Sequence, residues 1–254
     1  MSRNESSESK KKVTATPTVS GGVQVRTLFS WPEFQIKVAD LQARKAYIWR
    51  GQRKDLAWPL KSKFDRHFKS RDRERRNDLL KSKIEKFRKA MNQSYPQVPL
   101  GSDDNVWALG QHYGLKTPLL DWTLSPYIAA YFAFAEPSDG DDQYRYVYAL
   151  QKSISRLIVK PSRQTFVEVI EKLDFPSPRF SVQRSVFTKA LDGDDIETNV
   201  RRFIKLRPNR MLLVKFQIPA SERKKCLDDL DMMNINYGTL LLDLRDVVDM
   251  CEDI

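Results

Sequence analysis

The sequence predicts an α+β fold formed by one domain. Segments with helical and strand periodicity are mixed without the regular alternation that a doubly wound sheet requires. The chain has 254 residues and is 41% hydrophobic, which is enough apolar material for a sizeable core. The first 20 residues contain no aromatic side chain and show no periodicity. We therefore expect residues 1–24 to be a flexible tail that precedes a domain over residues 25–254.

Capping residues and apolar spacing predict the helices. Ser30 and Glu33 form a capping-box pattern at the start of the first helix. Ser125 suits an N-cap and Pro126 the first helical position, ahead of a segment that is apolar on nearly every face and should be buried. We expect helices at residues 31–42, 71–91, 107–113, 126–136 and 221–233.

Short runs rich in β-branched and aromatic residues predict the strands. One begins at Tyr47 and stops at Gly51. Glu168 and Glu171 fall in a stretch with the pattern of a helix, and we expect both to be surface residues. Further strands are expected at residues 144–150, 211–218 and 239–242.

Composition excludes several classes of protein. No apolar run approaches the roughly 20 residues that cross a bilayer, and the N-terminus lacks the hydrophobic core of a signal peptide. We therefore expect a cytoplasmic protein with no membrane partner. The two cysteines, Cys226 and Cys251, are too few for a disulfide scaffold and lack the paired spacing of a zinc site. Reduced thiols and no bound metal are expected.

The charge is strongly positive and unevenly distributed. The formal net charge is +11, which favours attraction to nucleic acid or another polyanion. Residues 61–90 hold 13 basic and 5 acidic residues, whereas residues 219–254 hold 4 basic and 9 acidic residues. The basic region from Lys61 to Lys89 is a candidate nucleic-acid surface. An amphipathic helix with a solvated basic face explains the same pattern.

The segment over residues 109–126 has the densest set of groups able to bind a ligand. Hydrogen-bonding and aromatic side chains surround two glycines and two prolines there: His112, Tyr113, Asp121, Trp122, Thr123 and Ser125. A packed loop with a buried histidine explains this composition as well as a binding site does.

A second candidate lies at the end of the strand that starts at Tyr47. Arg50 places a guanidinium there, and Gly51 leaves room for a ligand to approach the backbone. A guanidinium at such a position suits bidentate binding of a phosphate group. Gln52 follows Gly51 and belongs to the same candidate segment.

Together these segments resemble the FRG domain family. Its aromatic-Arg-Gly motif stands here at residues 49–51, and an aromatic-Pro-Leu element at residues 58–60. The central motif, Gln-His-Tyr-Gly-Leu-x-Thr-x-Leu-Leu-Asp-Trp-Thr, spans residues 111–123 and continues into a Ser-Pro and an Ala/Phe-rich helix. A later Arg-x-x-x-Gln-x-x-x-Phe element is matched by Arg179, Gln183 and Phe187. The resemblance runs from about residue 25 to the C-terminus.

The FRG domain is remotely similar to the ADP-ribosyltransferase superfamily. This similarity implies a split mixed sheet with flanking helices, NAD as the substrate, and nucleic acid or protein as the acceptor. It also implies a bacterial toxin or phage-defence effector, with an antitoxin or defence-system protein as a partner. The implied catalytic residues are Arg50 at the phosphates, Thr123 at the nicotinamide ribose and Gln183 at a ribose hydroxyl. The implied NAD-binding residues are Arg50, Gly51, Gln52, His112, Tyr113, Asp121 and Trp122, with Tyr113 or Trp122 as an aromatic shelf.

Two other functions would use different residues. A metal-dependent nuclease would draw on the acidic segment at residues 192–197, whose sequence is also typical of a polar turn. A catalytically silent module that binds nucleic acid or protein would use the region from Lys61 to Lys89 and leave Arg50 and the groups from Gln111 to Thr123 as part of the scaffold.

Overall fold

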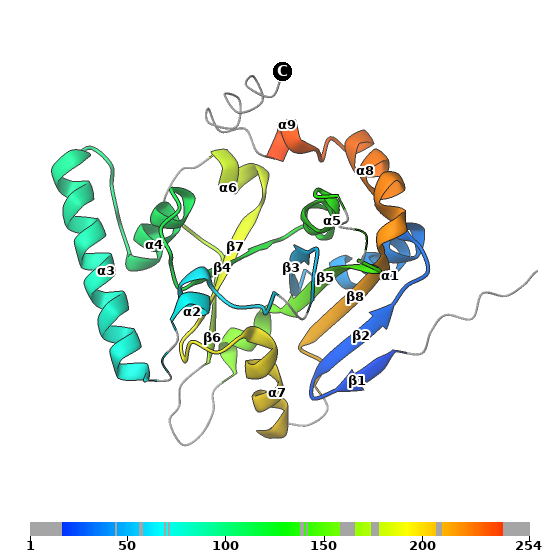
Figure 1. The fold of residues 1–254 in the computed structure, drawn as a ribbon, viewed down its shortest axis with the longest axis horizontal. Coiled ribbons are helices and arrows are strands. Elements are labelled where there is room, and N and C mark those ends of the chain that lie inside the picture. Colours follow the sequence, from blue (N-terminus) through cyan, green and yellow to red (C-terminus); the bar gives the residue numbers. More distant parts are fainter. Residues whose placement is uncertain are drawn as a thin grey trace, which may run out of the picture.

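One mixed sheet of eight strands forms the centre of the protein. It is seen in a computed structural model, which describes residues 17–43, 45–55, 58–68, 70, 72–137, 140, 142–157, 166–173, 178–206 and 210–240. Within these ranges the strand order is β1-β2-β8-β5-β3-β4-β7-β6, and helices flank the sheet (Figure 1). The predicted α+β domain is confirmed.

The elements are bounded as follows. The strands are β1 (Thr18–Ser20), β2 (Val23–Thr27), β3 (Tyr47–Gln52), β4 (Leu119–Thr123), β5 (Tyr144–Gln151), β6 (Val167–Ile170), β7 (Ser185–Ala190) and β8 (Leu213–Pro219). The helices are α1 (Trp31–Ala43), α2 (Lys63–His67), α3 (Arg73–Ser94), α4 (Asp103–His112), α5 (Pro126–Phe134), α6 (Pro178–Val182), α7 (Ile196–Leu206), α8 (Arg223–Met232) and α9 (Tyr237–Leu240). Two short 3₁₀ helices, η1 (Lys152–Arg156) and η2 (Ala220–Glu222), follow β5 and β8.

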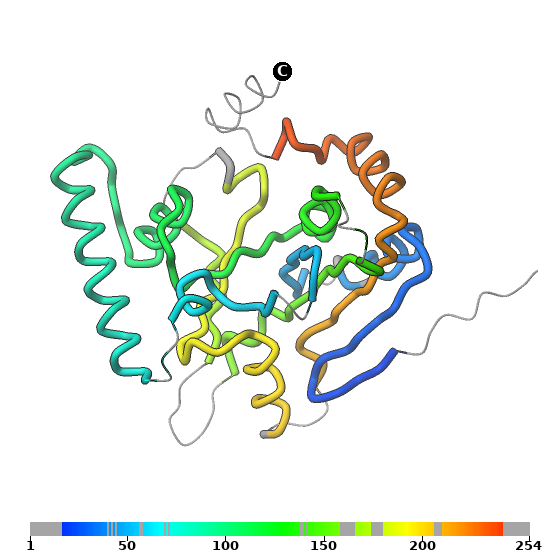
Figure 2. Tube along the Cα trace, in the orientation of Figure 1, coloured from blue at the N-terminus to red at the C-terminus, as the bar shows by residue number. Residues whose placement is uncertain are grey.

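The sheet joins segments that are distant in sequence. Strands β2 and β8 lie side by side and run parallel, although they come from nearly opposite ends of the described chain (Figure 2). The other described neighbours are antiparallel. Strand β1 pairs with β2 from Thr18 to Ser20, so the sheet begins within the segment predicted to be a flexible tail. Residues 1–16 lie outside the described residues.

The sheet parts between β3 and β4. These two strands share a single residue pair, Trp49 with Thr123, whereas β3 pairs with β5 through six residues. Strands β4, β7 and β6 therefore form a section that diverges from the rest. A cavity opens at this divergence.

Three apolar clusters hold the helices on the sheet. The first joins α1, α5 and α8 to one face of β3, β5 and β8, with Phe34, Trp49 and Phe216 at its centre. The second lies under α7 and includes Ile48, which alternates with Trp49 along β3. The third packs α3 and α4 against β4 and β7, and includes Trp107.

Local capping explains why two of the helices begin where they do. At α1, the Ser30 hydroxyl accepts from the Glu33 amide at 3.4 Å, and the Glu33 carboxylate accepts from the Phe29 amide at 2.9 Å. At α5, the Ser125 hydroxyl accepts from the Ile128 amide at 3.3 Å. The starts predicted for both helices are confirmed.

Two predicted elements are wrong. Residues 239–240 belong to helix α9 and not to a strand, and residues 241–242 lie outside the described residues. Glu168 lies in strand β6, where it pairs across the ladder with Lys189, and not in a helix. Among the residues that the structure describes, none of the helices has the length and apolar character needed to span a membrane.

Candidate functional site

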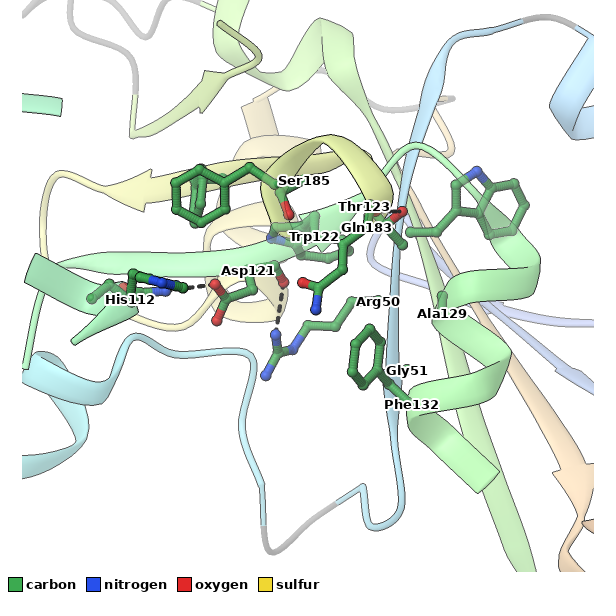
Figure 3. Close-up of a pocket in the computed structure, with 14 residues that line it drawn as sticks. Arg50, Gly51, His112, Asp121, Trp122, Thr123, Ala129, Phe132, Gln183 and Ser185 are labelled. Atoms are coloured by element: carbon green, nitrogen blue, oxygen red, sulfur yellow. Dashed lines mark hydrogen bonds between the residues drawn. The ribbon is translucent and has the colours of Figure 1, made fainter. Parts of the chain in front are cut away.

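A cavity of about 410 Å³ lies where β3 and β4 diverge. Figure 3 shows its lining side chains converging from both sides of the split. Arg50 and the segment over residues 111–123 meet there, as the sequence predicted. The lining residues are Trp49, Arg50, Gly51, Gln111, His112, Asp121, Trp122, Thr123, Ala129, Phe132, Phe180, Gln183, Ser185 and Phe187.

Arg50 bridges the two diverging strands. Its Nη1 donates to the backbone carbonyl of Asp121 at 2.7 Å, and its Nε donates to the Gln52 side-chain oxygen at 3.2 Å. Burial lowers the pKa of the Arg50 guanidinium from its ordinary value, while the carboxylate of Asp121 opposes the shift. Because an arginine side chain keeps its proton in proteins, Arg50 presents a fixed positive charge to the cavity.

Gln52 is a buried scaffold residue that does not line the cavity. Its side-chain nitrogen donates to the carbonyl of Trp58 at 2.7 Å and to the carbonyl of Lys54 at 3.3 Å. Its oxygen accepts from Arg50. The amide therefore links the loop after β3 to the guanidinium and fixes the direction of Arg50. We had expected this side chain to contact the ligand.

Gly51 makes room for a helix. A Cβ at this position would lie 1.8 Å from the carbonyl oxygen of Ala129 and 2.7 Å from the amide nitrogen of Ala133, both in α5. The aromatic-Arg-Gly motif thus needs glycine so that α5 can pack on β3. The space that we expected Gly51 to leave for a ligand is filled by Ala129 on this side.

Asp121 is held by a chain of side-chain hydrogen bonds. Its Oδ1 accepts from the Gln111 side-chain nitrogen at 2.6 Å, and the Gln111 oxygen in turn accepts from the Thr117 hydroxyl. Thr117 is fully buried. The three residues belong to the central motif, so this motif orients a carboxylate at the cavity wall.

The aromatic wall differs in part from the prediction, because Trp122 lines the cavity and Tyr113 does not. Tyr113 is 73% exposed, stacks edge-on against His112 and does not line the cavity. Phe132 of α5 and Phe180 of α6 line it instead, and Phe180 packs edge-on against His112 and Phe187. Phe132 is partly exposed within an otherwise buried helix, a pattern that the sequence alone does not distinguish from core packing.

The side chains of Trp122 and Thr123 mainly make contacts within the protein. The Trp122 indole nitrogen donates to the Thr188 hydroxyl at 2.9 Å, and the ring belongs to the cluster under α7. The Thr123 hydroxyl donates to the backbone carbonyl of Gln183 at 2.7 Å and accepts from the amide of Ser125 at 3.1 Å. Thr123 therefore positions Gln183.

Gln183 extends into the cavity toward Arg50 (Figure 3). Its side-chain nitrogen donates to the carbonyl of Leu240 in α9 at 2.9 Å. This bond fixes the orientation of the amide and leaves its oxygen as an acceptor. The side chain of Arg179, the first residue of the same sequence element, lies outside the described side chains.

The acidic segment at residues 192–197 forms ion pairs and a helix cap within the protein. Asp192 and Asp194 pair with Arg202 at 2.5 Å and 2.6 Å and raise the pKa of its guanidinium. Asp195 caps the start of α7 by accepting from the amide of Thr198 at 2.9 Å. Within the described residues, no cluster of histidine, cysteine, aspartate or glutamate has the geometry of a metal site. The nuclease alternative loses its support.

The basic region is divided between the core and the surface. Arg76 is buried, and its guanidinium pairs with Asp65 at 2.6 Å and donates to the carbonyl of Ala190 at 3.1 Å. The rest of α3 presents lysines to solvent, and Lys81, Lys86 and Lys89 are exposed. The helix over residues 71–91 is confirmed as an amphipathic helix, α3, that starts at Arg73.

Comparison with known proteins identifies one family. Residues 45–142 match the family model described as the FRG domain. No match was found among curated proteins or among solved structures. The matched segment runs from the turn before β3 through α5 and includes Arg50, Gly51 and Asp121, whereas Gln183 lies beyond it. Residues 45–142, which supply most of the cavity wall, are thus similar to the FRG domain.

Proposed function

We propose that the cavity binds NAD and that the protein transfers ADP-ribose from NAD to a nucleic acid or a protein. The observation that carries this proposal is the position of Arg50. Its guanidinium is fixed at the cavity wall by the carbonyl of Asp121 at 2.7 Å, opposite the amide of Gln183. A fixed guanidinium beside an aromatic wall suits a ligand that carries both phosphate and an aromatic ring.

The reaction would break the bond between the ribose carbon and the nicotinamide nitrogen. Nicotinamide leaves with the electron pair of that bond, and positive charge develops on the ribose ring. A nucleophile of the acceptor forms the new bond to the same carbon and loses its proton to water. Such an oxocarbenium-like transition state is stabilised by oriented acceptors near the ribose. The Gln183 oxygen is the acceptor suited to a ribose hydroxyl, and Phe132 or Phe180 would stack on nicotinamide.

The biological setting follows from the family resemblance. FRG-like domains are found in bacterial defence and toxin-like settings, which supports a role as a toxin or phage-defence effector with an inhibitory partner protein. The net charge of +11 supports a polyanionic acceptor such as nucleic acid.

The test is incubation of purified protein with labelled NAD and total cell extract. We expect release of nicotinamide and label in a protein or nucleic-acid fraction. Arg50→Ala protein, checked for an unchanged melting temperature, is the control. Absence of nicotinamide release and of label with every fraction would refute the transferase proposal.

A second candidate function is a binding module without catalysis. The observation that favours it is the exposed basic face of α3, where Lys81, Lys86 and Lys89 form no ion pair with any residue that the structure describes. Nucleic acid would bind this face through its phosphates. Binding to nucleic acid with no consumption of NAD would support this candidate over the transferase.

A further inference from the structure

A second cavity, of about 220 Å³, adjoins the first. The two share Arg50, Gln111 and Asp121, so Arg50 stands at their junction. The second cavity is closed on its other side by Lys63 and Arg66 of α2. Three cationic side chains and one carboxylate thus line it.

Helix α2 is anchored so that these two basic residues keep their positions. Its N-cap is Ser62, whose hydroxyl accepts from the Asp65 amide at 3.0 Å and donates to the Asp65 carboxylate at 2.7 Å. The amide of Phe64 donates to the carbonyl of Thr117 at 3.1 Å, and the Phe64 ring is buried. The helix is therefore fixed to the segment that precedes β4.

The charges of Lys63 and Arg66 have no ion-pair partner among the residues that the structure describes. Asp65, the acidic residue of α2, turns inward and pairs with buried Arg76 at 2.6 Å. Neither Lys63 nor Arg66 forms an ion pair or side-chain hydrogen bond with any residue in the described ranges. Arg66 is near enough to Arg50 to lower the pKa of its guanidinium by repulsion.

Asp121 offsets only part of this charge. Its Oδ1 is taken by Gln111, and its backbone carbonyl by Arg50. An excess of positive charge at a small concave site, held by residues with fixed backbones, is unfavourable until an anion arrives. A group with two or more negative charges matches the excess.

We propose that the second cavity is a phosphate subsite, in which Lys63 and Arg66 bind the diphosphate of a nucleotide. The nicotinamide end of this nucleotide occupies the first cavity. Arg50 contacts the same diphosphate at the junction. This inference rests on the proposed function for the identity of the nucleotide as NAD, and it deepens that proposal by naming the residues that select a phosphorylated ligand. The carboxylate of Asp121 disfavours a third phosphate on that side.

The test uses ADP-ribose and adenosine as probes, with binding measured by calorimetry. We expect wild-type protein to bind ADP-ribose more tightly than adenosine. Arg66→Gln and Lys63→Gln should each weaken ADP-ribose binding by about tenfold to a hundredfold and leave adenosine binding unchanged. Lys225→Gln is the matched control, because it removes the same charge from an exposed position on α8 that lines neither cavity.

The outcomes separate this inference from the proposed function. Equal affinity of wild-type, Arg66→Gln and Lys63→Gln proteins for ADP-ribose would overturn the phosphate subsite, even if NAD were cleaved. No binding of ADP-ribose by wild-type protein would also overturn it. Binding of ADP-ribose that depends on Lys63 and Arg66, together with no release of nicotinamide from NAD, would leave the subsite standing and refute the transferase.

Discussion

Arg50 donates to the backbone carbonyl of Asp121 at 2.7 Å at the point where β3 leaves β4. In an unbroken antiparallel ladder, a carbonyl at this position would accept from a backbone amide of the neighbouring strand. Here a guanidinium takes that role, so this carbonyl of the opened sheet edge remains satisfied. The same side chain bridges the two strands and supplies a positive charge to the cavity.

The first prediction follows from this double role. Arg50→Ala should weaken NAD or ADP-ribose binding by about tenfold to several hundredfold, because each charge-assisted hydrogen bond is worth roughly 1.5–3 kcal/mol. Arg50→Lys keeps the charge but loses the planar fork, so it should restore only part of the affinity. Calorimetric titration checks both, with thermal melting as the fold control. Unchanged affinity in Arg50→Ala would exclude Arg50 from the binding site.

The second prediction concerns Gly51. Gly51→Ala would bring a Cβ to 1.8 Å from the Ala129 carbonyl, so α5 must move away from β3. We expect a loss of about 3 kcal/mol or more in the free energy of unfolding, at or above the upper end of ordinary overpacking. Gly238→Ala is the control, since a Cβ there meets only the Asn236 side chain at 3.6 Å. Similar urea midpoints for the two variants would contradict the packing argument.

The starts of α1 and α5 were predictable from sequence because their signals are local, whereas the helix expected from residue 107 begins at Asp103. Ser125 caps α5 through bonds that span three residues. The start of α9 was missed although it has a comparable signal: the Asn236 side chain accepts from the Thr239 amide at 3.0 Å, and the Thr239 hydroxyl accepts from the Asn236 amide at 3.1 Å. The apolar run at residues 239–242 has the pattern of a strand, which led to the wrong prediction.

The site was predictable only in part, because its geometry depends on distant segments. Arg50 and Asp121 stand in motifs whose composition marks them as candidates. The direction of a side chain depends on its place in the fold: pairing of β4 turns Trp122 into the core, whereas Tyr113 lies at the C-terminal end of α4 and faces solvent. Phe180 has no local signal, since only the fold brings α6 beside His112.

The third prediction separates the two kinds of basic residue in α3. From the sequence alone, Arg73, Arg75 and Arg76 are alike, and charge reversal of the three should weaken nucleic-acid binding without disturbing the fold. The structure corrects this for Arg76, which is buried against Asp65. Arg76→Gln should lower the free energy of unfolding by about 3–5 kcal/mol, because Asp65 would remain buried without its partner. Arg75→Gln, at an exposed position, should change it by less than about 0.5 kcal/mol. Equal urea midpoints for the two variants would contradict this assignment.

The fourth prediction tests the exposed basic face of α3. If Lys81, Lys86 and Lys89 contact phosphates, the triple glutamine variant should bind single-stranded nucleic acid more weakly. Its plot of log affinity against log salt should also be shallower by about 2, since each contact contributes roughly 0.7. Fluorescence anisotropy between about 50 and 200 mM salt measures this. Lys224→Gln on α8 is the control, because Lys224 is already paired with Asp228. If the slope does not change in the triple variant, these lysines do not contact phosphates and the basic face of α3 is only solvated.

The fifth prediction concerns Gln183, whose side-chain nitrogen is bound to the Leu240 carbonyl at 2.9 Å. Gln183→Ala should leave NAD affinity nearly unchanged and lower kcat by about tenfold, because a ribose contact that strengthens in the transition state acts mainly on the rate. Initial-rate measurements of nicotinamide release separate kcat from KM. A raised KM with unchanged kcat would make Gln183 a ground-state binding residue.

Gln183→Glu discriminates between a catalytic and a structural role. The substitution removes the donor to Leu240 and places a carboxylate near that carbonyl, which should cost about 1–3 kcal/mol of stability. The carboxylate would share a cavity with Arg50 and is only partly buried, so its charge is not left isolated. If the Gln183 oxygen faces the ribose, a carboxylate there stabilises the developing positive charge better than an amide does, and nicotinamide release should be preserved or raised. If the amide only anchors α9, the same loss of stability should be accompanied by lowered NAD cleavage. That result, together with no nicotinamide release by wild-type protein, would leave binding as the better account of this domain.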